Sequence, residues 1–166
     1  MRYTKSKFPY ATLFALALGA TTASADLSIE RHVSITDSAG GSLVMLSAGS
    51  RDDLGGESTT TATFVDFQAA SDRRRINGEV IRERISTAEQ VETTYNGVLE
   101  IFTSATEDSA ERMDTLVFEN LVVLREGEGP GLSGQVIFNG EVRQAADLPR
   151  PALRMLARAL RFFHFA

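Results

Sequence analysis

Hydrophobic and polar residues alternate along much of the chain with the spacing of half-buried β-strands. In the segment 27–35, one face carries Leu27, Ile29, Val33 and Ile35, and the other carries serine, glutamate and histidine. A period of two residues is typical of a strand that covers a core with one face. The segment therefore predicts a first strand with one apolar face.

Further strands are predicted where short runs of aliphatic, β-branched and aromatic residues stand between glycine-rich or charged segments. These runs are 42–48, 59–68, 95–104, 114–126 and 132–145, the last of them divided by an Asn-Gly turn. The segment 79–92 is ambiguous, because Ile81, Ile85, Ala88 and Val91 also recur at helical spacing. Its charged residues interleave with β-branched ones, so we favour a strand over a helix there.

Three of the four asparagines precede a glycine, at Asn77-Gly78, Asn96-Gly97 and Asn139-Gly140. Asn-Gly is the strongest short hairpin signal, because a type I′ turn needs positive φ at both of its central residues. We therefore expect a tight turn at each of these positions. Their spacings of 19 and 43 residues are unequal, which argues against a repeat protein.

Seven to nine short strands joined by tight turns predict a mainly β fold, either an antiparallel sandwich or a small barrel. No linker-like stretch divides the chain, so residues 26–166 are expected to form a single β-rich domain, which ends in one amphipathic helix at about 149–165. The chain has no cysteine. Its stability must therefore come from packing, without disulfides.

The first 25 residues have the features of a secretory signal peptide. Basic residues precede a short apolar run at 11–20, and residues 23–25 read Ala-Ser-Ala, a small-x-small cleavage pattern. The apolar run is too short to span a bilayer, which takes about 20 residues. We expect cleavage after Ala25 and a mature protein in the periplasm or outside the cell.

Charge is divided unevenly between the body and the C-terminal segment. All 22 acidic residues lie between Asp26 and Asp147, whereas the segment 150–166 carries four arginines and no acid. An acidic body argues against nucleic acid as a partner, because phosphate binding needs clustered positive charge. The run 73–75 is the only basic cluster of the body, and we interpret it as a solvated loop or strand end.

The C-terminal segment predicts an amphipathic helix with Asp147 as its N-cap and its arginines opposite an apolar arc. The helix could cover the protein's own sheet, bind a partner or a second copy, or lie in a membrane interface. The first interpretation is favoured, because each large apolar side chain contributes about 1.5–3 kcal/mol when buried. Membrane contact is the least favoured, since each arginine adds only about 1 kcal/mol of attraction to an anionic surface.

If the helix is an interaction surface, its apolar face supplies the candidate binding residues. These are Leu156, Leu160, Phe162, Phe163 and Phe165. Phe162 and Phe165 are placed on the side that the core does not require. Whether these two side chains are buried or exposed therefore distinguishes a core helix from an interaction surface.

The residue types offer little for metal binding, and no cofactor is expected. The chain has only two histidines, His32 and His164, and neither has a partner at metal-ligand spacing. Asp52, Asp53 and Glu57 form a weak calcium candidate, because oxygen ligands suit a hard cation. They lack the alternating acids of an EF-hand.

Carboxylates leave one enzymatic alternative open, a small secreted hydrolase that uses two facing acids. The candidates are Asp52, Asp53, Glu57, Glu107 and Asp108. The motif G-x-G-x-x-G at 129–134 precedes a strand and not a helix, so it does not predict a dinucleotide site. The sequence favours a non-enzymatic binding or cell-envelope-associated protein, whose partner is an unidentified protein or envelope component.

Overall fold

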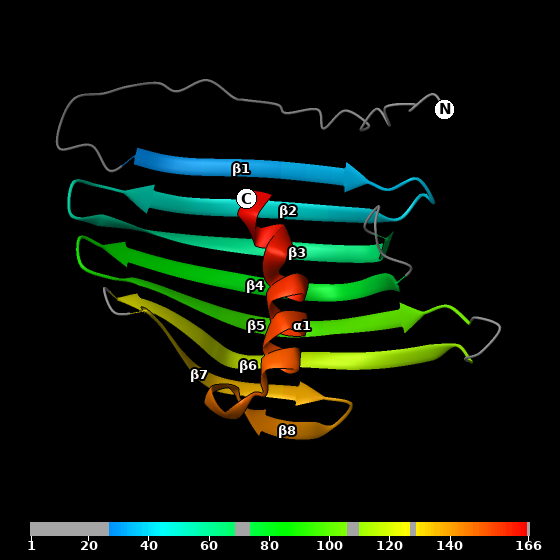
Figure 1. The fold of residues 1–166 in the computed structure, drawn as a ribbon. Coiled ribbons are helices and arrows are strands. Elements are labelled where there is room, and N and C mark those ends of the chain that lie inside the picture. Colours follow the sequence, from blue (N-terminus) through cyan, green and yellow to red (C-terminus); the bar gives the residue numbers. More distant parts are fainter. Residues whose placement is uncertain (1–26, 69–73, 106–109, 127–128, 166) are drawn as a thin grey trace, which may run out of the picture.

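The alternating segments form eight strands in the computed structural model, which describes residues 27–68, 74–105, 110–126 and 129–165. The strands are β1 (Leu27–Thr36), β2 (Ser42–Arg51), β3 (Gly55–Gln68), β4 (Arg74–Thr87), β5 (Val91–Thr103), β6 (Arg112–Glu126), β7 (Gly129–Phe138) and β8 (Glu141–Gln144). A 3-10 turn η1 (Ala145–Asp147), helix α1 (Arg150–Leu160) and a second 3-10 segment η2 (Arg161–Phe165) follow. All neighbouring strands pair antiparallel and in sequence order (Figure 1).

The predicted mainly β, antiparallel class with one C-terminal helix is confirmed. The strands form one open sheet, so the finer prediction of a sandwich or a small barrel is not confirmed. The ambiguous segment 79–92 is strand, with β4 ending at Thr87, a turn over 88–90 and β5 beginning at Val91. Asp147 lies in η1 and is not the N-cap, because α1 begins only at Arg150. The predicted leader, 1–25, lies outside the described residues.

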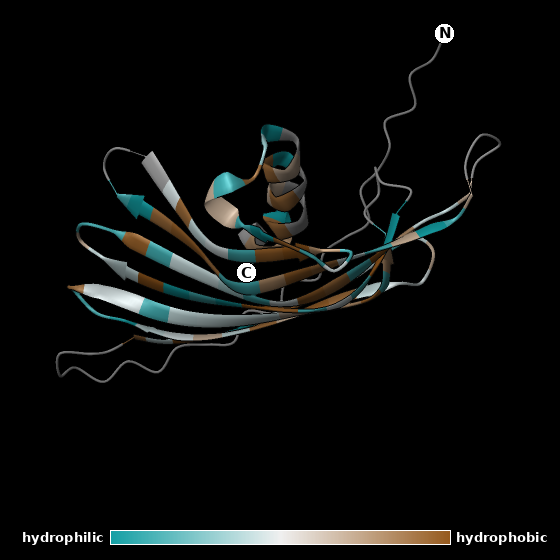
Figure 2. Cartoon of the chain, turned by 90° about the horizontal axis from the view of Figure 1, so that it is seen from below, coloured by the Kyte–Doolittle hydropathy of each residue, from teal (hydrophilic) through white to brown (hydrophobic). Residues whose placement is uncertain are grey.

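A helix takes the place that a second sheet would have in a sandwich. Figure 1 shows α1 lying across the strands, from the β7 side of the sheet toward β2. Figure 2 shows the sheet curving around α1, which gives it a concave face that carries the helix and a convex face on the other side. A sheet with one apolar face must bury that face against another element. Here α1 and η2 supply the cover.

The concave face is apolar because the register aligns large side chains in rows across the strands. One row of paired positions consists of Leu43, Phe64, Gly78, Leu99, Leu116 and Phe138. All of its leucines are fully buried. Strand alternation sends Leu46, Ile81 and Val98 to the convex face, where they are exposed. The core therefore lies between the concave face and the helical segments.

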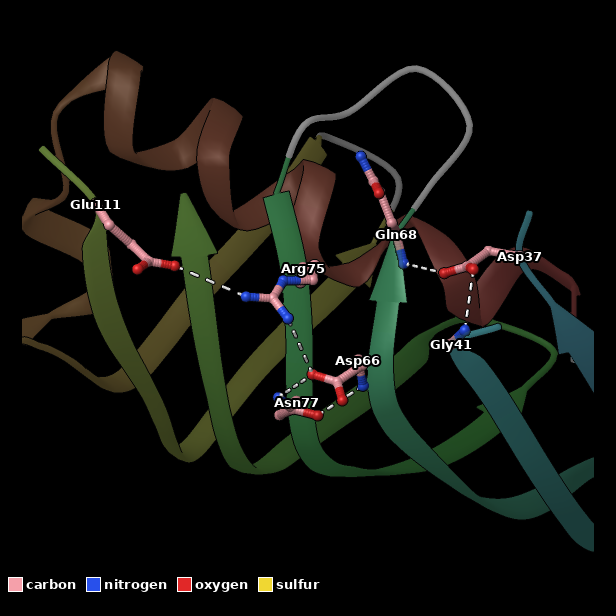
Figure 3. Close-up of polar contacts among 7 residues, drawn as sticks. All are labelled: Asp37, Gly41, Asp66, Gln68, Arg75, Asn77 and Glu111. Atoms are coloured by element: carbon pink, nitrogen blue, oxygen red, sulfur yellow. Dashed lines mark hydrogen bonds and ion pairs between the residues drawn. The ribbon is translucent and has the colours of Figure 1, made fainter. Parts of the chain in front are cut away.

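Two of the three predicted Asn-Gly turns are wrong, because Asn77-Gly78 lies inside β4 and Asn96-Gly97 inside β5. Only Asn139-Gly140 makes a turn, between β7 and β8. Inside the sheet, the Oδ1 atoms of Asn77 and Asn96 each accept a backbone N–H from a neighbouring strand. Asp66 N–H lies 2.6 Å from Asn77 Oδ1 (Figure 3), and Asn120 N–H lies 2.8 Å from Asn96 Oδ1.

Asn77 and Asn96 mark β-bulges instead of turns. Asp66 and Asn120 both have φ of 48°, and the strand register shifts beside each of them. A bulge and a hairpin turn both need left-handed backbone, so the same local signal serves either purpose. Bulges bend the strand that contains them, and glycines permit the close approach of its neighbour. These positions therefore account for the curvature of the sheet.

The side chain of Asp37 links the turn between β1 and β2 to the end of β3 by hydrogen bonds. Its Oδ1 accepts the N–H groups of Ala39 at 2.7 Å and Gly41 at 3.0 Å, and its Oδ2 accepts Gln68 N–H at 2.5 Å (Figure 3). Burial raises the pKa of Asp37, but hydrogen bonds from the backbone of Gln68, Ala39, Gly41 and Gly40 outweigh it, so the pKa lies below its ordinary value. The ionised carboxylate is therefore the form that stabilises this corner.

Replacing Gly97 with alanine tests whether the bulges shape the sheet. Gly97 has φ of 145°, and a Cβ there would lie 2.2 Å from Glu79 O and 2.7 Å from Val80 Cα. Gly140 is the matched control, since it has φ of 83° but no atom within 4 Å of its added Cβ. We expect Gly97→Ala to lower the free energy of unfolding by at least about 2 kcal/mol more than Gly140→Ala, measured in urea. Equal losses would show that the close backbone approach is unimportant.

Replacing Asp37 with asparagine tests the carboxylate by its pH dependence. The folded pKa lies below the unfolded value of about 3.9, so the carboxylate stabilises the fold above that pH, and this contribution is lost as the pH falls through the folded pKa. We expect Asp37→Asn to cost about 1 kcal/mol at neutral pH and the difference from wild type to shrink on acidification. Urea unfolding over a pH series measures it, with the exposed Asp53→Asn as control. A difference independent of pH would contradict the role of the charge.

Candidate functional site: the concave face beneath the helix

A row of polar side chains crosses the concave face beside the apolar rows. The register pairs Ser47 of β2 with Thr60 of β3, Thr60 with Arg82 of β4, and Arg82 with Tyr95 of β5. Thr60 is fully buried, and only 9% of the surface of Arg82 is exposed. The row lies under η2, where Phe163 packs its ring edge-on against Tyr95 at 5.5 Å between centroids.

Arg82 ties this row to the C-terminal segment. Its Nη1 donates to the carbonyl oxygen of Phe163 at 2.7 Å, and its Nη2 donates to Thr60 Oγ1 at 2.9 Å. Thr60 Oγ1 also lies 2.9 Å from Ser47 Oγ. The guanidinium carbon lies 5.3 Å from the centroid of the Phe163 ring, in cation–π geometry. Arg82 Nε is buried and has no hydrogen-bond partner among the described residues.

The charge of Arg82 has no counter-ion among the described residues. Neither of its hydrogen-bond acceptors is charged, and none of the ion pairs found between described residues involves it. Burial lowers the pKa of Arg82, Tyr95 opposes that effect and Arg84 adds to it. Burial also raises the pKa of Tyr95, against the opposing charges of Arg82, Arg125 and Arg84. Burying an unpaired cation costs several kcal/mol of folding free energy. An anion bound next to Arg82 would offset that cost.

An apolar cavity opens at the other end of α1. Its volume is about 300 Å³. It is lined by Leu116, Val136, Phe138, Glu141, Arg143, Leu148, Pro149, Ala152 and Leu156. The polar members, Glu141 and Arg143, form an ion pair of 2.7 Å on β8. The cavity therefore has apolar walls and a charged rim.

The candidate binding residues of the helix mostly face the protein's own sheet. Leu156, Phe162 and Phe163 are buried, and Leu160 is half-buried. The side chain of Phe165 lies outside the described residues. The placement of Phe162 away from the core is wrong, because the change from α-helix to 3-10 geometry at Arg161 alters the direction in which each later residue points.

Phe162 is held in the core by two aromatic contacts. Its ring lies 5.5 Å from those of Phe64 and Phe67, edge-on in both cases. The guanidinium carbon of Arg161 lies 5.1 Å from the centroid of the same ring. Such pairs contribute about 0.5–1.5 kcal/mol beyond the burial of their area.

The calcium candidate does not assemble. Asp52 Oδ1 accepts the N–H groups of Leu54 at 2.8 Å and Gly55 at 2.9 Å, which shapes the turn between β2 and β3. Asp53 and Glu57 are exposed. Among the described residues, no group of three or more histidines and acids is placed to hold a metal ion.

The other sequence candidates lie on the surface or outside the described residues. His32 is exposed on the convex face. Arg75 of the basic run lies in β4, where it forms exposed ion pairs with Asp66 at 3.9 Å and Glu111 at 3.7 Å (Figure 3). Surface pairs of this kind contribute little. Glu107, Asp108 and the side chain of His164 are outside the described residues.

Sequence analysis missed Arg82 because it noted only the helical spacing of Ile81 and Ile85 in 79–92 and assigned neither face of the strand to the core. In the structure both isoleucines are exposed, and Val80 and Arg82 face the core. The available signal was Val80, which shares its face with Arg82 at a spacing of two residues. Only the pairing with Thr60 decides between the two phases.

The chain matches no protein-family model, no curated protein and no solved structure. Neither α1 nor any other helix among the described residues combines the length and apolarity that a membrane span requires. Its function must therefore be inferred from the site itself.

Truncating Phe162 tests whether η2 belongs to the core. Phe162→Ala is expected to lower the free energy of unfolding by about 3–5 kcal/mol, because it leaves a cavity between Phe64 and Phe67. Leu54, with 81% of its surface exposed, is the control, and Leu54→Ala should change stability by less than about 0.5 kcal/mol. Urea unfolding of both variants measures the difference. Near-equal stabilities would mean that η2 does not pack on the sheet in solution.

Proposed function

We propose that the protein is a non-enzymatic binding module of the periplasm or the extracellular space, which takes a small, mostly apolar molecule between α1 and the concave face. The apolar cavity at the N-terminal end of α1 carries this proposal. The signal-peptide pattern of the first 25 residues supports the compartment. An association with the cell envelope would follow from ligands that originate there.

The cavity has the properties of a ligand site. Small-molecule sites are concave, mostly apolar and furnished with few polar groups, and they begin at about 300 Å³. The cavity reaches that volume and has one ion pair, Glu141 with Arg143, at its rim. At about 30 Å³ per water-sized group, it accommodates about ten non-hydrogen atoms. An alkyl chain of that length with one polar end fits both the walls and the rim.

The hydrolase alternative has less support from the same cavity. Hydrolysis by paired carboxylates needs two acids that face each other across the substrate. Glu141 is the one acid that lines the cavity among the described residues, and it is paired with Arg143. A binding function is therefore the proposal that the cavity favours.

Filling the cavity tests the proposal. Ala152 lines it from the helix, so Ala152→Leu adds three carbon atoms to its interior. We expect wild-type protein to bind 1-decanol saturably, and Ala152→Leu to bind it at least about tenfold more weakly because the added atoms take its place. NMR titration of the alanine and leucine methyl signals measures both affinities. Ala48→Leu, at an exposed position of β2, is the matched control and should bind as wild type does.

Two results would contradict the proposed site. Wild-type protein could show no saturable methyl shifts with 1-decanol, which would mean that the cavity takes no alkyl chain. Alternatively, Ala48→Leu could weaken binding as much as Ala152→Leu, which would place the alcohol elsewhere on the molecule.

A further inference from the structure

Among the described residues, the buried guanidinium of Arg82 has one donor nitrogen without an acceptor and a positive charge without a counter-ion. In the part of the chain that the structure describes, its Nε has no partner, and both of its acceptors, the Phe163 carbonyl and the Thr60 hydroxyl, are neutral. Buried polar groups are almost always satisfied, and an unsatisfied one calls for an explanation in function or in strain. An arginine that is more than nine-tenths buried without an acid is a stronger case, because both its charge and its donor lack a partner.

We propose that Arg82 binds the anionic oxygen group of the ligand, and that the Phe163 carbonyl occupies this position while the ligand is absent. The ligand is then an amphiphile with a carboxylate or similar oxyanion at one end and an alkyl chain at the other. This deepens the proposed function and rests on it for the alkyl chain, whereas the anion site stands on the surroundings of Arg82 alone.

The chemistry of the guanidinium selects this class of group. Arginine presents its donors as a planar fork that matches the two oxygens of a carboxylate, and such pairs are shorter and stronger than bonds to a neutral carbonyl. Once the Phe163 carbonyl has left, Nη1 and the second N–H of Nη2 supply two such donors on the outer edge of the guanidinium. Thr60 holds the guanidinium from the β3 side through Nη2, so the fork keeps its orientation when Phe163 leaves.

The Phe163 carbonyl is a replaceable occupant. It belongs to a short 3-10 segment, and it brings only the partial charge of a backbone acceptor to Arg82. A carboxylate brings a full charge into the same low-dielectric place, so the exchange is favourable wherever the end of η2 can move aside.

The two ends of the ligand lie at a compatible separation. Leu156 lines the apolar cavity, and Phe163 covers Arg82 seven residues later. Those seven residues advance about 10–12 Å along α1 and η2. A ligand that fills the cavity with its alkyl chain and reaches Arg82 with its anionic end must therefore bridge about this distance.

Titrations with matched alcohol and acid test the proposal. The Arg82 Nε–Hε NMR signal of the full chain is followed while decanoate, 1-decanol or acetate is added. We expect decanoate to shift that signal saturably and to bind about 10- to 100-fold more tightly than 1-decanol, because a charge-assisted hydrogen bond is added. Arg82→Met should remove the preference for decanoate, and the exposed neighbour Arg84→Met, two residues along β4, should keep it.

The three added molecules distinguish a free anion from an amphiphile, and they distinguish a failure of the anion site from a failure of the apolar site. If acetate saturates the Arg82 signal as tightly as decanoate does, the anion site is supported and the alkyl chain adds nothing to it. If 1-decanol fails to bind while decanoate or acetate reaches Arg82, the apolar part of the proposed function is contradicted and the anion site is supported.

Three results would overturn the assignment. Equal affinities of wild type for decanoate and 1-decanol, an Arg82 signal that no anion moves, or a preference that survives Arg82→Met would each show that Arg82 only fastens η2 to the sheet. Should Arg82→Met fail to fold, the wild-type Nε–Hε titration decides alone, because it needs no variant.

Discussion

The packing of Phe162 and Phe163 on the concave face is the contact on which the rest of the molecule depends. A single sheet with one apolar face is unstable in water until something covers that face. The described residues form no second sheet, and the cover consists of α1 and η2. Phe162 closes the apolar side against Phe64 and Phe67, and Phe163 closes the polar side over Arg82 and Tyr95. A tail that resembles an interaction motif in the sequence is therefore first a part of the core.

That contact requires a curved sheet, and the curvature comes from a few positions with left-handed backbone. Asp66 and Asn120 sit in bulges, each held by an asparagine side chain from the neighbouring strand. Gly97 lets the backbone of β4 approach closely at the same level of the sheet. The apolar cavity lies between α1 and the β8 end of the sheet, where Glu141 and Arg143 of β8 line it.

Much of the fold could be predicted from the sequence, since strand alternation is a local property. The runs from Leu27 onward, the strand character of 79–92 and the terminal helix all follow from residues close together in the chain. Two of the three Asn-Gly turns, at 77–78 and 96–97, are wrong predictions because a bulge and a turn need the same backbone, and only the partner strand distinguishes them. The burial of Arg82 could not be predicted for a similar reason, because it depends on the strand register with Thr60, which is 22 residues away. The candidate site is made of such non-local pairings.

The central claim, that the C-terminal helix is a core element over the concave face, has a direct measurement in native-state amide hydrogen exchange. The amides of α1 are compared with those of the central strands β4 and β5 in the ligand-free protein. If the helix is part of the core, the α1 amides open with a free energy close to that of the strands, because both are released only by global unfolding. If the α1 amides exchange as fast as exposed turn amides while β4 and β5 stay protected, the helix is detached in solution and the claim is wrong.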